Sequence, residues 1–243
     1  MKPVHHLTTR RHYRLLLPVM LSALTLAACH HDKKDAPNTE NRTFKISITN
    51  LTANQPLSPL AAIAHTHGYH AFMDGQAASS ALEKLAEGGD HQPLIIQAKA
   101  DSHYLDSRTG TAPIAPGASD SLEVSVTHGS KAYLSLLSML VNTNDGFTAA
   151  NSYHLADLAL HQSRTLMLPA WDAGTEANTE AAGTLPGPAD LGEGYNATRD
   201  DTVNQVGIHR GVISADDGLA SSVLNGSHRF DNPVARLTIT RID

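Results

Sequence analysis

Three segments of the chain alternate apolar and polar residues with a period of two. In the first, Phe44, Ile46 and Ile48 are separated by polar residues, and the pattern recurs over residues 122–126 and 235–240. Successive side chains of a β-strand point to opposite faces of a sheet, so each segment is predicted to be a strand with one buried face. Such strands require a second layer to cover that face, which favours a layered β fold.

Shorter apolar runs predict additional strands. Residues 94–97 and 134–141 are largely apolar and are predicted to be strands with more complete burial. Residues 166–168 and 206–208 carry weaker strand patterns. Clusters of Gly, Pro, Asn and Asp, which are typical of turns and loops, lie between these segments.

Only one stretch, residues 78–87, has the pattern of a helix. Ser79 or Ser80 can cap its start, and the pair Gly88-Gly89 can end it. Many short strands, long polar connections and one short helix are typical of an antiparallel β-sandwich. We therefore predict an all-β fold with a single helix.

The first 28 residues have the pattern of a targeting signal. A basic start precedes an apolar run over residues 15–28, which is too short to span a bilayer as a helix. The run ends in Leu26-Ala27-Ala28-Cys29, and small residues before a cysteine are typical of a lipoprotein cleavage site. Cys29 is the only cysteine of the chain, which favours lipidation of its thiol over an ordinary signal peptide followed by a chance cysteine.

Cleavage before Cys29 would divide the chain into three parts. They are a signal peptide (1–28), the lipidated cysteine with a polar, flexible tether (29–42) and one domain (43–243). With Cys29 lipidated, no disulfide can form, so the core or a metal must stabilise the domain. The net charge of −6 argues against nucleic acid as a partner. His30 stands where Asp would be the usual inner-membrane retention mark, which favours the outer membrane if the cell has two membranes.

Acidic residues follow two of the predicted strands, on loops rich in small residues. Asp145 comes after the apolar run 134–141, and Asp172 begins a block that continues with Glu176 and Glu180. Calcium takes roughly six to eight oxygen ligands, and carboxylates with loop carbonyls supply them. The sequence therefore allows a calcium site on these loops.

The spacing of these acids leaves an alternative open. It does not match a helix–loop–helix calcium loop, in which ligands come from every second position. Gly146 and Gly174 would let the backbone turn sharply enough to aim carbonyls at a metal. Asp and Asn also form turns by accepting hydrogen bonds from nearby backbone amides, without any metal.

Several blocks of the sequence resemble the spondin domain, the module of F-spondin, mindin and many bacterial surface proteins. The block Asp-Ala-Gly-Thr-acid at residues 172–176 is the most distinctive. The resemblance implies a C2-like antiparallel β-sandwich that holds one calcium ion in loops at one end. The side-chain ligands that it implies are Asp145, Asp172 and Glu176. The blocks occur in the family's order, within residues 43–242, and are 48–52, 55–59, 136–140, 143–147 and 172–176.

Two departures from the animal members limit what the resemblance implies. The third acid is Glu176 where those proteins have Asp, so its carboxylate lies one methylene further from the backbone. The animal members also use cysteines and carry thrombospondin-type repeats, and the predicted domain of this chain (43–243) has neither. Their matrix and cell-guidance roles are therefore not transferred, and only the module and its adhesive use are implied.

A second candidate site is the cluster His65, His67 and His70. Histidines at this spacing can bind zinc when a further ligand joins them. Gly68 interrupts any regular element, so an ordinary loop is the prediction and a transition-metal site the alternative. The sequence contains no nucleophile elbow, no phosphate-binding glycine-rich loop and no His-Glu-x-x-His motif.

These features predict a binding module without enzymatic activity. The function that they favour is a lipid-anchored, calcium-binding spondin domain that contacts a protein or a glycan at the cell envelope. One alternative is a metal-assisted envelope hydrolase that uses the region from His65 to His70. The other is an envelope lipoprotein with a purely structural role.

Overall fold

The computed structural model describes residues 41–127, 131–155 and 157–243. The predicted signal peptide, Cys29 and residues 30–40 of the predicted tether lie outside the described residues. Within the described ranges, none of the helices has the length and apolar character needed to cross a membrane.

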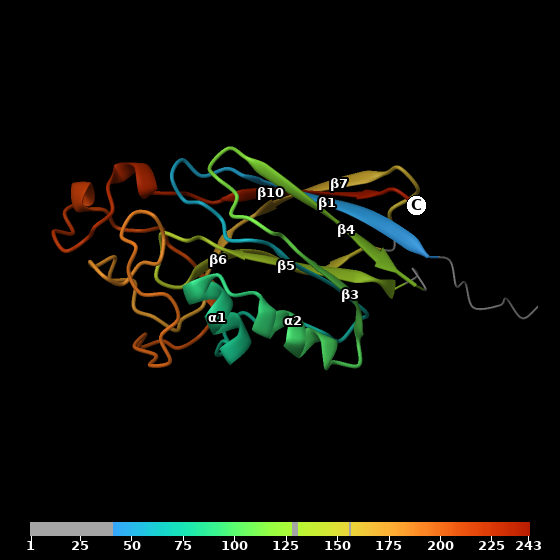
Figure 1. Cartoon of the computed structure of the whole chain (residues 1–243), viewed down its shortest axis with the longest axis horizontal. Helices are drawn as coiled ribbons and strands as arrows, with labels where there is room; N and C mark the ends of the chain where they lie inside the picture. Colours follow the sequence, from blue (N-terminus) through green and yellow to red (C-terminus); the bar gives the residue numbers. More distant parts are fainter. Residues whose placement is uncertain (1–40, 128–130, 156) are drawn as a thin grey trace, which may run out of the picture. The chain divides into compact units, whose positions relative to one another are not determined.

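Two antiparallel sheets form the body of the domain (Figure 1). The four-stranded sheet has the order β4-β1-β10-β7, and the six-stranded sheet has the order β3-β2-β5-β6-β8-β9. Apolar side chains of both sheets meet in one core, so the predicted all-β sandwich is confirmed. The strands are β1 (Arg42–Asn50), β2 (Ala61–His65), β3 (Tyr104–Thr109), β4 (Ser119–Val126), β5 (Tyr133–Met139), β6 (Gly146–His154), β7 (Ser163–Leu168), β8 (Ala170–Asp172), β9 (Gly207–Ile208) and β10 (Ala235–Arg241).

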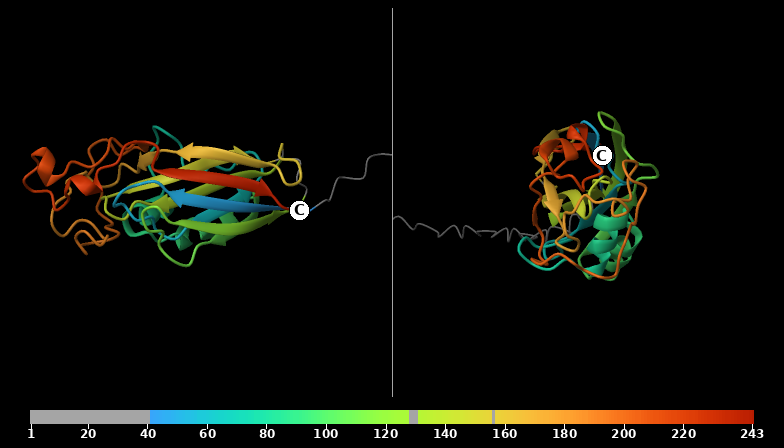
Figure 2. Two further views of the ribbon diagram at one scale, coloured as in Figure 1. Left: turned by 90° about the horizontal axis from the view of Figure 1, so that it is seen from above. Right: turned by 90° about the vertical axis from the view of Figure 1, so that its left-hand side faces the viewer.

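The three alternating segments of the sequence become neighbouring strands of one sheet. β1 lies between β4 and β10, and Ile46 faces Leu122 on one side and Ile239 on the other. Phe44, Ile46 and Ile239 are fully buried, while the intervening polar residues face outward. Figure 2 shows these strands from above, with the C-terminal strand running between β1 and β7. The period-two prediction is confirmed because this sheet has one dry and one solvated face.

The six-stranded sheet is covered on both faces and therefore shows little alternation. Its second face packs against α1 (Ser80–Gly88) and α2 (Gln92–Lys99). All five residues of β2 are buried, and three of them are alanines. A short run of small buried residues has no period-two signal, so the sequence did not predict β2.

The helical layer corrects one prediction and confirms another. Residues 94–97, predicted to be a buried strand, belong to α2, so the domain has two α-helices among its described residues and not one. Leu94 and Ile95 are buried but Ile96 is 66% exposed, a one-sided pattern that four residues are too few to reveal. In α1, Ser79 accepts a hydrogen bond from the Leu82 amide as the predicted N-cap.

Long connections gather at one end of the sandwich, which we call the loop end (residues 173–234). Between β8 and β10 the chain forms only β9 and two short 3-10 helices, η2 (Ala215–Asp217) and η3 (Gly226–His228). A small core of Leu185, Val212 and Leu224 packs within it. In Figure 1 the loop end is the orange and red region at the left, opposite the C-terminus.

Candidate functional site

The strand order brings Asp145 and Asp172 together. Asp145 ends the turn between β5 and β6, and Asp172 is the last residue of β8. Because β6 pairs with β8, Gly146 lies opposite Asp172. The Ala173 amide also donates to the backbone carbonyl of Asp145 (3.2 Å). Both acids thus lie at strand ends beside the loop end, as predicted.

The carboxyl group of Asp145 is fully buried and only half satisfied. Its Oδ2 accepts hydrogen bonds from the amides of Thr175 (2.7 Å) and Glu176 (3.1 Å) and from the Thr175 hydroxyl (3.2 Å). Its Oδ1 is buried without a hydrogen-bond partner. Burial, followed by the charge of Asp172, raises the pKa of Asp145 to about 7, although the hydrogen bonds to Oδ2 oppose this shift.

Asp172 is held by a turn that requires glycine. Its Oδ1 accepts a hydrogen bond from the Gly174 amide (2.8 Å), and its Oδ2 accepts one from the Asn178 side chain (2.6 Å). Gly174 has a φ of +67°, and a Cβ there would lie 2.3 Å from the carbonyl oxygen of Gln205. Any other residue would therefore push the neighbouring loop away.

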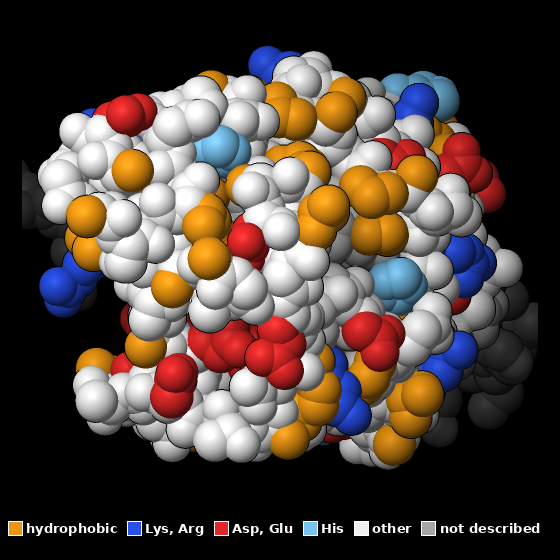
Figure 3. Space-filling model, turned by 60° about the vertical axis from the view of Figure 1, so that its left-hand side comes forward, with side chains coloured by type: hydrophobic (Ala, Val, Ile, Leu, Met, Phe, Trp, Pro, Cys, Tyr) orange, Lys and Arg blue, Asp and Glu red, His pale blue; other side chains and the backbone are white. Residues whose placement is uncertain are grey.

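Glu176 extends the acidic cluster toward α1. Burial, followed by the charges of Glu87, Asp145, Asp200 and Glu193, raises the pKa of Glu176 to about 8. Figure 3 shows acidic side chains gathered on this side of the molecule. The structure thus surrounds the predicted acids with more carboxylates than the sequence blocks contain.

Glu87 of α1 is a member of this cluster that the sequence did not reveal. It is fully buried, and its Oε2 accepts a hydrogen bond from the Asn196 amide (2.9 Å) while its Oε1 has no partner. Burial raises its pKa. A glutamate in the last turn of an amphipathic helix carries no signal for a distant loop site, because only the fold places them together.

An ion pair fastens the loop end to α1 beside the cluster. Arg199 donates to both carboxylate oxygens of Glu83, at 2.9 Å each, and to the carbonyl of Ala78 (2.8 Å). Next to it, Asp200 accepts a hydrogen bond from the Ala177 amide (2.7 Å). The bidentate pair thereby fixes the segment that carries one wall of the acidic cluster.

The donor chemistry of this cluster fits a hard cation, although its side chains do not form a closed shell. No group of three His, Cys, Asp or Glu side chains within the described ranges is arranged to hold a metal ion. Two buried carboxylate oxygens, Asp145 Oδ1 and Glu87 Oε1, nevertheless lack partners. Uncompensated buried carboxylates are costly, and a bound cation or a proton relieves that cost.

His209 borders the cluster with one ring nitrogen engaged and the other, Nε2, without a partner. It is buried, and its Nδ1 accepts a hydrogen bond from the Gly211 amide (3.0 Å). Burial lowers its pKa, with a smaller opposing effect from Asp172. A neutral ring that accepts through Nδ1 carries its proton on Nε2, and this nitrogen is buried without a hydrogen-bond partner.

The predicted histidine cluster is divided between a strand and a loop. His65 ends β2 with both ring nitrogens engaged, Nδ1 with the Thr66 carbonyl (2.9 Å) and Nε2 with the Ser135 hydroxyl (3.0 Å). His70 contacts the Ser152 hydroxyl (3.2 Å), and His67 packs against the Tyr133 ring. The loop prediction is confirmed for residues 67–70 and wrong for His65.

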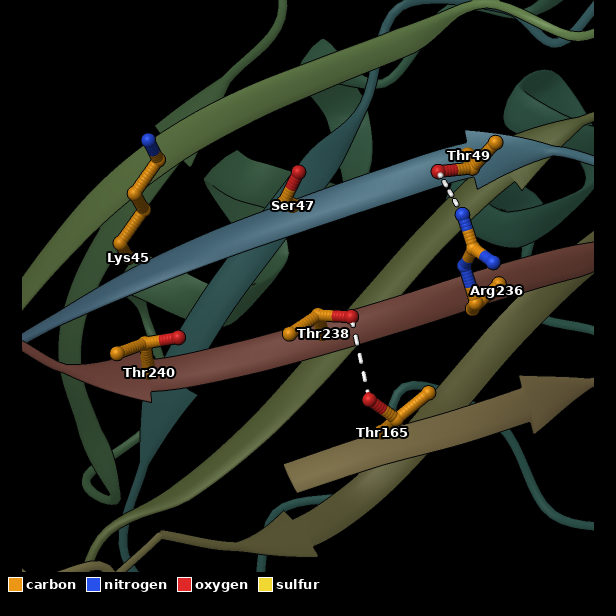
Figure 4. Close-up of a pocket in the computed structure, with 7 residues that line it drawn as sticks. All are labelled: Lys45, Ser47, Thr49, Thr165, Arg236, Thr238 and Thr240. Atoms are coloured by element: carbon orange, nitrogen blue, oxygen red, sulfur yellow. Dashed lines mark hydrogen bonds between the residues drawn. The ribbon is translucent and has the colours of Figure 1, made fainter. Parts of the chain in front are cut away.

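A shallow hollow of about 580 Å³ lies on the outer face of the four-stranded sheet (Figure 4). Hydroxyl groups of neighbouring strands meet there, and Thr165 pairs with Thr238 (3.3 Å). The Arg236 guanidinium donates to the Thr49 hydroxyl (3.4 Å). This face therefore presents paired polar groups on a regular sheet, and the acidic cluster remains the stronger candidate site.

Comparison with known proteins agrees with this architecture. No curated protein matches the chain. The model of the Spondin_N family matches residues 42–184, which is more than half of the chain and runs from β1 past β8. The matched range includes Asp145, Asp172 and Glu176. The chain therefore belongs to the Spondin_N family.

Proposed function

We propose that this protein is an exported lipoprotein whose spondin domain binds calcium and contacts a protein or a glycan at the cell envelope. The observation that carries the proposal is the buried, unpartnered Oδ1 of Asp145 beside Asp172 and Glu176. Spondin-domain proteins are typically extracellular, and Spondin_N is not known as an enzyme family. Both facts support binding outside the cell over catalysis.

Calcium would act on the loop end by compensating charge. Asp145, Asp172 and Glu176 would supply carboxylate oxygens, and loop carbonyls would complete the shell. Desolvation and mutual repulsion raise the pKa of both Asp145 and Glu176, so a divalent cation would favour their ionised forms. The ion would thus order the loops that are proposed to meet the partner.

Calorimetry of the full chain tests the calcium site. We expect calcium at a hundredfold excess over its Kd to raise the Tm by about 5–10 °C relative to chelator. Asp145→Asn and Asp172→Asn should each abolish most of this shift, whereas Glu123→Gln on β4 should retain it. An unchanged Tm in calcium, or an equal shift in the Asp145 and Asp172 variants, would contradict the assignment.

Lipid attachment through Cys29 is a separate part of the proposal. We expect the wild-type chain in the membrane fraction and Cys29→Ser in the soluble fraction, with the mass of the wild type increased by acyl groups. Labelling of intact cells with an antibody against the domain would then locate it on the outer or inner side. Equal membrane association of Cys29→Ser would remove the anchor from the proposal.

A further inference from the structure

A pocket of about 450 Å³ opens at the loop end, between the segment after β8 and the segment that contains β9. It borders the acidic cluster at Asp172 but extends away from Asp145 and Glu176, which do not line it. Its wall includes Glu180, an acid that the calcium proposal does not use. The side chains that matter here are Asp172, Glu180, Asp201, Val203, Arg210 and Ile213.

Glu180 is the buried polar group of this pocket. Its residue exposure is 1%, its Oε1 accepts a hydrogen bond from the Ile213 amide (3.2 Å), and its Oε2 has no partner. Burial raises the pKa of Glu180 to about 7. Glu180 thus lines the pocket with one carboxylate oxygen that has no hydrogen-bond partner.

The backbone of Glu180 has an unfavourable conformation, which its neighbours hold in place. Its φ is +47°, in the left-handed region that residues other than glycine rarely adopt. Its amide donates to the Asn144 side chain (3.3 Å), and its carbonyl accepts from the Val223 amide (2.9 Å). Unfavourable backbone geometry that the surroundings enforce is common at binding sites, because it fixes a side chain for its ligand.

The rest of the pocket combines negative charge with exposed aliphatic groups. Asp172 and Asp201 add carboxylates to its wall, against the single cation Arg210. At the rim, Val203, Ile208 and Ile213 are 61%, 51% and 53% exposed. A positively charged group on an aliphatic stem would match both features, with its charge at Glu180 and its stem on the rim.

We propose that this pocket binds the lysine side chain of a partner protein. An ammonium group presents three separate donors, of which one can bond to Oε2 of Glu180 and the others to the carboxylates of Asp172 and Asp201 or to water. A guanidinium prefers two parallel carboxylate oxygens, but Oε1 is already engaged with the backbone. The open aliphatic rim would contact the four-carbon stem and the surface around it, which suits a side chain presented by a protein.

The lysine pocket deepens the proposed adhesive function but does not need calcium. Glu180 is not one of the three proposed calcium ligands, and Asp172 contributes only to the wall that the two sites share. Loss of the calcium-dependent Tm shift in Asp145→Asn reports on the calcium site alone. Lysine binding in chelator reports on the pocket alone, so the two proposals can fail separately.

The test compares two peptides that differ only in the group at the end of one side chain. Binding of a short peptide with a central lysine to the full chain is measured by calorimetry in chelator at pH 8, where Glu180 is ionised. The matched peptide carries norleucine, which keeps the aliphatic stem without the charge. A hydrogen bond between charged groups corresponds to a preference on the order of tenfold or more for the lysine peptide.

Variants of the chain then place the preference in the pocket. Glu180→Gln should bind both peptides equally, Ile213→Ser should weaken both, and Glu123→Gln should behave as wild type. Amide chemical shifts of Gly207, Gly211 and Ile213 should change on lysine-peptide binding, which verifies a folded pocket. Equal binding of both peptides by the wild type, or an unchanged lysine preference in Glu180→Gln, would overturn the proposal, as would stronger binding of a free diamine than of the peptide.

Discussion

The sandwich body and the loop end differ in which buried polar groups lack hydrogen-bond partners. In the body, His65 is fully buried and both of its ring nitrogens have partners. Beside and within the loop end, Asp145 and Glu180 are also buried, and each leaves one carboxylate oxygen without a partner. The body also has buried atoms without partners, such as Tyr69 Oη and Trp171 Nε1, but the unpartnered carboxylate oxygens of the described residues all lie in or beside the loop end. This difference supports the proposal that a ligand binds there.

The largest effect should come from the core of the body. Phe44 is fully buried between the sheets, so Phe44→Ala should lower the free energy of unfolding by about 3–5 kcal/mol. Met167→Ala is the control, because Met167 on β7 is 55% exposed and should cost far less. Urea denaturation measures both. The loss should be the same in calcium and in chelator; a loss that calcium reverses would mean that the two regions are not separate.

The next effect concerns pH and the loop end. The pKa of Glu180 is raised from 4.5 to about 7, so the folded chain holds a proton that the unfolded chain releases. Its stabilising contribution is complete below pH 4.5 and is lost as the pH rises toward 7, by up to about 3 kcal/mol. Between pH 4.5 and 8 the unfolding free energy should fall less in Glu180→Gln than in the wild type, while the raised pKa values of Asp145 and Glu176 contribute equally to both. Losses of equal size in both chains would mean that Glu180 does not contribute.

The attachment of the loop end to the helical layer should contribute somewhat less. Arg199→Met leaves Glu83 buried without its bidentate partner, which should cost about 1.5–3 kcal/mol. A double variant with Glu83→Gln should recover part of that loss. Proteolysis of the loop end should increase in the single variant while the sheets remain protected from hydrogen exchange. Uniform loss of protection would show that the two regions unfold together.

In the body, His65 should cause a smaller change in stability with pH, opposite in direction to that of Glu180. Burial lowers the pKa of His65 below 6.5, so the folded chain favours the neutral ring. The stabilising contribution is complete above pH 6.5 and is lost as the pH falls through that value. His65→Gln should therefore lose less stability than the wild type between pH 7 and 5.5. A wild-type chain that gains stability over this range, relative to the variant, would reverse the sign and contradict the burial argument.

The sequence predicted those strands whose environment is one-sided. The periods around Ile46, Leu122 and Ile239 persist because one face of their sheet is dry and the other is wet. Where both faces are covered the alternation disappears; the long apolar run 134–141 still predicted β5, but the short β2 was missed. The error in residues 94–97 has the same origin, since a four-residue apolar run fits a buried strand and a short helix equally well.

The candidate site was likewise predicted only in part from the sequence. Asp145, Asp172 and Glu176 were identified from a resemblance between sequence blocks, and their positions beside strand ends followed from the apolar runs before them. Their chemistry required the fold: the unpartnered oxygen of Asp145 depends on its burial. Glu87 joins them from a helix, and its contribution could not be read from its neighbours in the sequence.

The sequence by itself determined that this chain forms β layers, belongs with spondin domains and carries an acidic block after a strand. It also predicted the lipid anchor at Cys29, which remains to be tested. Only the tertiary structure decided which acids are buried, which of their oxygens lack partners and which pocket Glu180 faces. The physical reason is that periodicity reports the local alternation of environment, whereas burial and charge coupling depend on residues that are distant in sequence and adjacent only after folding.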